Sequence, residues 1–232
     1  MMYMLRTNFR SAILLLAILS SCGNDQQKKE GKLNARPAAA APVSTETKPE
    51  VRNILFFGTS LTAGYGLDPE QAYPAIIQKK IDSLNLPYKV INGGLSGETS
   101  AAGKSRIDWM LKQPVGIFVL ELGANDGLRG LAVPETSANL QAVIDKVKAK
   151  YPNVKLVMAG MQMPPNMGAK YTADFKAVFS NLAQKNNMAY VPFLLEGVGG
   201  VASLNQEDGI HPTAEGQKIL AENVWVRLKP LL

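Results

Sequence analysis

The chain has 232 residues, of which 25 are lysine or arginine and 19 are aspartate or glutamate, so its formal net charge is +6. Half of this excess lies in residues 1–50, and no segment interleaves basic with aromatic residues on one face, which argues against nucleic acid as a partner. A single histidine and a single cysteine are too few for a disulfide framework or a zinc site. We therefore expect no metal and no cofactor.

Residues 1–22 have the layout of a secretory signal. Two arginines precede an apolar core, 12–19, which is too short for a permanent membrane span, and small residues then lead to Cys22. The end of this segment resembles a bacterial lipoprotein signal, in which the cysteine becomes the lipidated first residue. A lipidated Cys22 is expected to hold an exported protein on a membrane of the bacterial cell envelope, facing the periplasm or the exterior. An ordinary signal peptide and a signal anchor are the alternatives.

Residues 23–50 are polar and rich in alanine and proline. Such a segment cannot bury enough apolar surface to offset the entropy lost on ordering, so we predict a disordered tether. The remaining residues, 51–232, suffice for one domain with a substantial core.

Within 51–232, five short apolar runs alternate with segments of helical periodicity. The runs are nearly continuous, as in strands that are covered on both faces. We expect strands at 53–57, 89–92, 116–121, 155–159 and 189–192. Apolar residues with helical spacing predict helices at about 73–84, 98–112, 140–147, 170–186 and 213–229. This alternation predicts a single α/β domain in which helices cover both sides of a parallel sheet.

In such sheets, ligands bind at the carboxyl ends of the strands, near a switch in strand order. Polar or glycine-rich loops follow the first three predicted strands, and another precedes the last predicted helix. These loops are 58–60, 93–97, 123–127 and 208–212. We expect them to converge on one rim of the sheet.

His211 is the single histidine, and it follows Asp208 by three residues and directly precedes Pro212. Proline at this point favours the start of a helix. A carboxylate at this spacing can accept the Nδ1–H of the imidazole and leave Nε2 free. This pair would supply the base and the orienting group of a serine hydrolase triad; the alternative is an ordinary loop histidine.

Ser60 follows the first predicted strand at a turn into a helix, where a free backbone N–H favours negative charge. Taken alone, Ser60 is better explained as a helix cap, and Thr62 occupies the last glycine position of a G-x-S-x-G elbow. Asn125 carries an amide that can donate to an oxyanion, although Asn-Asp-Gly also suits a turn. The segment 97–105 is similar to a phosphate-binding loop, but five residues separate its glycines where the motif requires four. Nucleotide binding is therefore not expected.

Four stretches together resemble the SGNH (GDSL-type) hydrolase family, and specifically its branch of periplasmic thioesterases, lysophospholipases and arylesterases. They are "FFGTSLTAGYGL", "INGGLSGETSAAG", "LELGANDGLRG" and "DGIHPTAEGQ". They occur in the family's order and span essentially all of 51–232. The resemblance implies a flavodoxin-like three-layer α/β/α sandwich with a five-stranded parallel sheet.

The resemblance also implies the roles of individual residues. Ser60 would be the nucleophile, His211 the general base and then the general acid, and Asp208 the group that orients His211. The oxyanion hole would comprise the backbone N–H groups of Ser60 and Gly94 and the side-chain amide of Asn125. No cofactor is implied.

One residue departs from the family pattern, because the usual Gly-Asp-Ser-Leu block reads Gly-Thr-Ser-Leu here. Thr59 offers a hydroxyl where the family has a carboxylate, and both can bond to a nearby backbone N–H. We expect the change to tune activity without abolishing it.

The loop 158–171, which includes Met163 and Met167, is rich in methionine and proline. It is expected beside the active rim, where flexible methionines suit the wall of an acyl-chain site; ordinary packing is the alternative. The resemblance implies a small-molecule or lipid ester as substrate. A carbohydrate O-acetylesterase and a non-catalytic binding lipoprotein are the competing interpretations, and the sequence does not indicate an oligomeric state.

Overall fold

The structure is a computed structural model that describes residues 52–232. The predicted signal segment 1–22, with Cys22, and the predicted tether 23–50 lie outside the described residues. Within 52–232, none of the helices combines the length and apolar character that crossing a bilayer requires.

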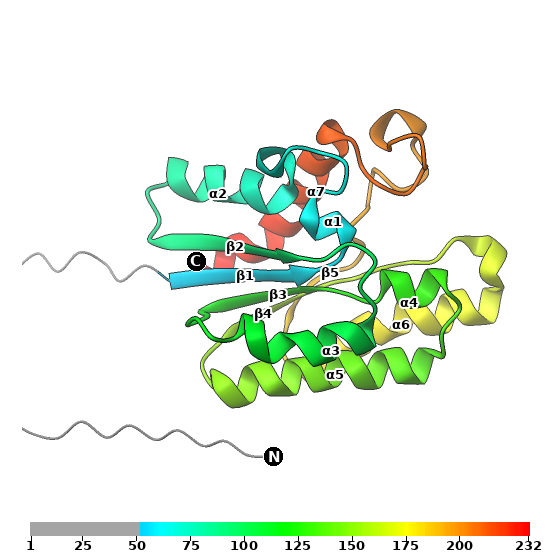
Figure 1. The fold of residues 1–232 in the computed structure, drawn as a ribbon, viewed down its shortest axis with the longest axis horizontal. Helices are drawn as coiled ribbons and strands as arrows, with labels where there is room; N and C mark the ends of the chain where they lie inside the picture. Colours follow the sequence, from blue (N-terminus) through cyan, green and yellow to red (C-terminus); the bar gives the residue numbers. More distant parts are fainter. Residues whose placement is uncertain (1–51) are drawn as a thin grey trace, which may run out of the picture. The chain divides into compact units, whose positions relative to one another are not determined.

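Five parallel strands form one sheet in the order β2-β1-β3-β4-β5 (Figure 1). The strands are β1 Arg52–Gly58, β2 Tyr88–Gly94, β3 Ile117–Glu121, β4 Lys155–Ala159 and β5 Ala189–Val191. The chain moves from β1 outward to β2 and then crosses back to β3, so the strand order switches between β1 and β3. Ligand sites of open α/β sheets form at such a switch.

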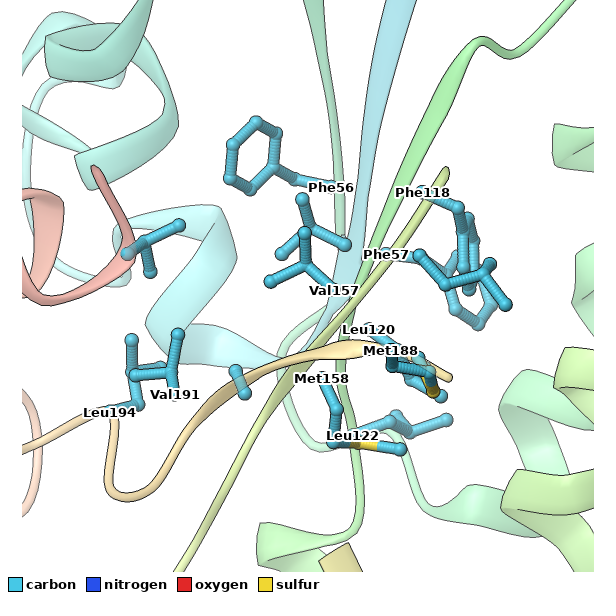
Figure 2. Close-up of a cluster of buried hydrophobic side chains, with 14 of the residues drawn as sticks. Phe56, Phe57, Phe118, Leu120, Leu122, Val157, Met158, Met188, Val191 and Leu194 are labelled. Carbon is cyan, nitrogen blue, oxygen red and sulfur yellow. The ribbon is translucent and has the colours of Figure 1, made fainter. Parts of the chain in front are cut away.

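The sheet is apolar on both faces because helices cover both. Four consecutive residues of β1, 54–57, are fully buried. Successive side chains of a strand point to opposite faces, and Figure 2 shows Phe56 on one side of the sheet and Phe57 with Phe118 on the other. Phe56 packs edge-on against Tyr73, at 5.6 Å between ring centroids.

Helices α2 and α7 lie over one face of the sheet, and α3, α5 and α6 lie over the other (Figure 1). The α-helices are α1 Ser60–Ala63, α2 Tyr73–Ser83, α3 Ser100–Met110, α4 Ala124–Leu128, α5 Val133–Lys150, α6 Ala169–Lys185 and α7 Ala214–Leu228. Short 3₁₀ turns are Pro69–Gln71, Pro165–Met167, Ala202–Leu204 and Lys229–Leu231. The expected three-layer α/β/α sandwich with five parallel strands is confirmed.

Most element boundaries differ by one or two residues from the sequence-based expectation. Helix α5 starts near residue 133 instead of 140, because Pro134 stands in its first turn, where proline is well tolerated. Strand β2 continues two residues beyond Asn92, to Gly94, which pairs with Gly58 of β1. Strand β3 begins one residue later than expected, after Gly116. The extension of β2 changes the assignment of a site residue, as described below.

Candidate active site

A cavity of about 600 Å³ opens at the carboxyl ends of the strands. Its lining includes residues from the loops that follow all five strands, as the sequence predicts. Ser60, Asn125 and His211 all line this cavity, although 151 residues separate Ser60 from His211. The topological switch between β1 and β3 therefore brings the three predicted groups to one place.

Ser60 is the first residue of α1, which starts directly after β1. Its Oγ lies 2.9 Å from Nε2 of His211. The short helix ends at Gly64, which has a φ of 74° and donates its N–H to the carbonyl oxygen of Ser60. Glycine suits this left-handed position because it has no side chain. The turn thus presents the hydroxyl to the cavity and fixes the backbone behind it.

Asp208 holds His211 by its side chain and by its backbone. Its Oδ2 lies 2.5 Å from Nδ1 of His211, and its Oδ1 accepts the backbone N–H groups of Ile210 and His211, each at 3.0 Å. The hydrogen bond from the His211 side chain, followed by these two backbone bonds, lowers the pKa of Asp208 to about 2. An ionised Asp208 accepts the Nδ1–H, so Nε2 is free to accept the Ser60 proton.

The ring of Tyr65 packs against His211, with 4.7 Å between ring centroids. Gln206 ties the two loops together, because its Nε2 donates to the carbonyl oxygen of Tyr65 and its backbone N–H donates to that of His211. These contacts are not predictable from the sequence. They join segments 141 residues apart, and no local pattern indicates such a contact.

Asn125 lies in the first turn of α4 and lines the cavity. Its Nδ2 donates one hydrogen to the carbonyl oxygen of Glu98 at 3.1 Å. A side-chain amide has two N–H donors, so this bond fixes the orientation of the amide and leaves its second hydrogen for a ligand.

Gly94 is not brought to the site, which corrects the expectation that it lines the oxyanion hole. As the last residue of β2, it donates its N–H to Oδ1 of Asn92 at 2.9 Å. A Cβ at this position would lie 2.2 Å from the backbone nitrogen of Ala63, so glycine is required by the close approach of α1. Gly97, three residues later and with a φ of 78°, lines the cavity instead. Within 52–232, neither its N–H nor that of Ser60 donates to a protein acceptor.

The hydroxyl of Thr59 contacts Glu121, the last residue of β3. It lies 3.0 Å from Oε1 of Glu121, and the backbone N–H of Thr59 donates to Oε2 at 2.9 Å. Glu121 is fully buried, and burial raises the pKa of its carboxyl. Glu121 was not predicted as a site residue, although a carboxylate that ends an otherwise apolar strand was a signal in the sequence.

The rest of the cavity wall is mainly apolar. It includes Leu61, Leu128, Met161, Met163, Phe193 and Ile210. Of the two methionines predicted for the substrate loop, Met163 lines the cavity, whereas Met167 packs against the core.

Among residues 52–232, no three histidine, cysteine or acidic side chains are grouped so as to hold a metal ion. The start of α3, which lies within the phosphate-loop-like segment, is occupied by Asp126, whose Oδ2 accepts the backbone N–H of Ser100 at 2.8 Å.

Comparison with known proteins identifies the family. Residues 56–219 match the model of the GDSL-like Lipase/Acylhydrolase family. Esterase TesA of Pseudomonas aeruginosa is 42% identical over 182 residues, which is 78% of this chain and 90% of that protein. The thioesterase 1/protease 1/lysophospholipase L1 of Escherichia coli K12 is 35% identical over 180 residues, 77% of this chain and 84% of that protein. A crystal structure of TesA matches with a TM-score of 0.75 at 42% identity, covering 78% of this chain and all of that one. The chain therefore belongs to the GDSL (SGNH) hydrolase family and is an enzyme that hydrolyses ester bonds.

Proposed function

We propose that Ser60, His211 and Asp208 form the catalytic triad of this esterase. The observation that supports it best is the continuous chain from Ser60 Oγ through both ring nitrogens of His211 to Asp208, at 2.9 and 2.5 Å. His211 accepts the Ser60 proton while Oγ attacks the ester carbonyl, and it returns the proton to the leaving group. A water molecule, deprotonated by the same imidazole, then hydrolyses the acyl-enzyme.

The oxyanion of the tetrahedral intermediate would be bound by three donors. They are the backbone N–H groups of Ser60 and Gly97 and the remaining amide hydrogen of Asn125. Their availability supports the assignment, since within 52–232 neither N–H has a protein acceptor and the Asn125 amide is oriented by Glu98. Removing one such donor typically lowers kcat by about 10² to 10³, which is the effect expected for Asn125→Ala.

The proposed substrates are carboxylic esters or thioesters with an apolar acyl chain, including lysophospholipids. The cavity of about 600 Å³, with its wall of leucine, methionine and phenylalanine side chains, supports this class. A site for acetyl groups needs far less apolar volume. The E. coli relative named thioesterase and lysophospholipase supports the same direction.

A series of p-nitrophenyl esters of increasing acyl length tests both proposals. The kcat/KM of the wild type is expected to rise by up to roughly fourfold per buried methylene, until the cavity is filled. Ser60→Ala and His211→Ala should each lower kcat by about 10⁶. Turnover retained by Ser60→Ala would exclude the mechanism, and a preference for acetate would favour an O-acetylesterase.

The proposed location is the bacterial cell envelope, with the enzyme held there by a lipid on Cys22. The signal-like layout of 1–22 and the composition of 23–50 support it. Cys22→Ala should move the protein from the membrane fraction to the soluble fraction. A Cys22→Ala protein that stays with the membranes would contradict lipidation as the anchor.

A further inference from the structure

The nucleophile turn rests on a buried carboxyl that the triad does not use. Glu121 is the last residue of β3, beside Gly58 of β1, and its side chain is completely inaccessible to solvent. An acidic side chain is almost never fully buried unless it is paired.

Four donors from the nucleophile turn converge on this carboxyl. Oε2 of Glu121 accepts the backbone N–H of Thr59 at 2.9 Å, the backbone N–H of Thr62 at 3.3 Å and the hydroxyl of Thr62 at 2.7 Å. Oε1 accepts the hydroxyl of Thr59 at 3.0 Å. Thr59 is the N-cap of α1, but its own side chain makes no cap bond. The carboxyl group of Glu121 thus supplies the acceptors that a capping side chain would give to the helix that carries Ser60.

The surrounding residues make room for this arrangement and complete it. A Cβ at Gly58 would lie 2.5 Å from Oε2 of Glu121, so only glycine lets the carboxyl reach the turn. The hydroxyls of Thr62 and Tyr73 are 2.9 Å apart. Gln217 of α7 accepts the backbone N–H of Tyr73 and donates to the carbonyl oxygen of Leu61. Both residues that flank Ser60 are therefore tied to buried polar groups.

We propose that Glu121 is a positioning residue for Ser60, acting through Thr59 and Thr62. The inference rests on the proposed function of Ser60 as the nucleophile. Glu121 itself touches neither Ser60 nor His211 by any hydrogen bond within 52–232. Its effect on catalysis is geometric.

Thr59 matters because it presents a donor to Oε1. A carboxylate at the same position would place two acidic groups in contact in a water-free site, where one of them has to keep a proton. The other titratable side chain of this cluster is Tyr73 on α2, whose pKa is raised by burial and then by the nearby Glu121. Tyr73 therefore stays a neutral phenol in the pH range of an esterase assay.

Substitutions at Thr59 test the link to Ser60 with little change of volume. Thr59→Val removes the hydroxyl and should lower kcat about tenfold at unchanged KM, since even a 1 Å displacement of a reacting group can lower the rate about 100-fold. Thr59→Ser keeps the donor and should restore a kcat close to that of the wild type. A wild-type kcat in Thr59→Val would overturn the proposal.

Substitutions at Glu121 test the carboxyl directly. Glu121→Leu removes every acceptor, and its kcat should fall about 100-fold. Glu121→Gln keeps one acceptor oxygen for the three donors on Oε2 and can donate to the Thr59 hydroxyl, so it should fold and lose only part of kcat. Asn186→Ala is the control, because Asn186 is a buried residue that bonds to Gln141 and Leu182, away from this turn. An equal fall of kcat in Asn186→Ala would make the effect one of general stability and overturn the proposal.

Thr59→Asp tests the proposal through the pH dependence of kcat, which would not change if Glu121 served only the stability of the fold. The kcat of this variant, relative to the wild type, should fall as pH rises from 5 to 9, because loss of the shared proton sets two carboxylates against each other at the turn. A ratio that is constant across this range would contradict the coupling of Glu121 to Ser60. Ser60→Ala is measured in the same series. Its residual turnover would overturn the triad itself, whereas an inactive Ser60→Ala with wild-type rates in the Thr59 and Glu121 variants would overturn only this inference.

Discussion

Two carboxyl groups support the proposed nucleophile Ser60, and one of them is exposed to solvent whereas the other is buried. Asp208 lies on the rim of the cavity with 40% of its side chain exposed, whereas Glu121 lies at the end of β3 with none exposed. Each accepts two backbone N–H groups, from His211 and Ile210 in one case and from Thr59 and Thr62 in the other. They differ chiefly in contact with water and in the nature of the side chain they hold.

The difference in environment moves the two pKa values in opposite directions. Hydrogen bonds from His211 dominate at Asp208 and lower its pKa to about 2. At Glu121, the loss of hydration outweighs all four hydrogen bonds, and its pKa is raised. The rim carboxylate is therefore a charged group that orients a base, whereas the buried carboxyl is an acceptor that shapes the backbone. The carboxyl group serves two purposes because solvent access, more than the number of hydrogen bonds, decides which charge state is stable.

The largest effect is expected when the substitution Asp208→Asn breaks the contact between the rim carboxylate and His211. Its kcat on a p-nitrophenyl ester should fall by about 10⁴, because an amide in this place has one acceptor oxygen and an NH₂ group that favours the wrong tautomer of His211. Asp174→Asn is the matched control, since Asp174 is an exposed carboxylate paired with Lys170. If Asp208→Asn kept a kcat within tenfold of the wild type, Asp208 would not be the orienting group.

The same contrast explains what the sequence could predict. Asp208 and His211 are three residues apart, so their pairing follows from local geometry, and a helix start at Pro212 makes it recognisable. The five strands were predictable because their apolar runs are nearly continuous. Ser60 and Asn125 could be brought together by topology alone, since both follow strands that flank the switch point.

The parts that could not be predicted depend on contacts that leave no local pattern. Gly94 and Gly97 both stand in a glycine-rich stretch, and the choice between them depends on where β2 ends, which pairing with β1 decides. Glu121 contacts Thr59 and Thr62 across about 60 residues of sequence. In the sequence, Thr59 therefore stands out only as a neighbour of the nucleophile. In the structure, its hydrogen-bond partner is a buried acid on another strand.

The buried carboxyl should also have a smaller effect, on the pH dependence of stability, that distinguishes it from Asp208. Because the folded-state pKa of Glu121 is raised, the folded protein keeps a proton that the unfolded chain loses, and this contribution to stability declines as pH rises above the ordinary glutamate range. Glu121→Gln has no such proton. Its free energy of unfolding relative to the wild type should therefore increase with pH, by about 1.4 kcal/mol per pH unit while the proton is retained. Urea unfolding between pH 5 and 8 measures this difference.

Asp208→Asn is the control for this measurement, because the pKa of Asp208 is lowered whereas that of Glu121 is raised. The lowered pKa of Asp208 gives stability that is present above pH 3.8 and is lost as pH falls towards 2. Because Asp208 is partly exposed, solvent limits that contribution to no more than about 1 kcal/mol, and none of it varies between pH 5 and 8. The contribution of Asp208 itself is therefore constant in this range, while the Glu121→Gln curve diverges from that of the wild type. A Glu121→Gln curve that runs parallel to that of the wild type would mean that the buried carboxyl is already ionised at pH 5, with its four hydrogen bonds outweighing burial.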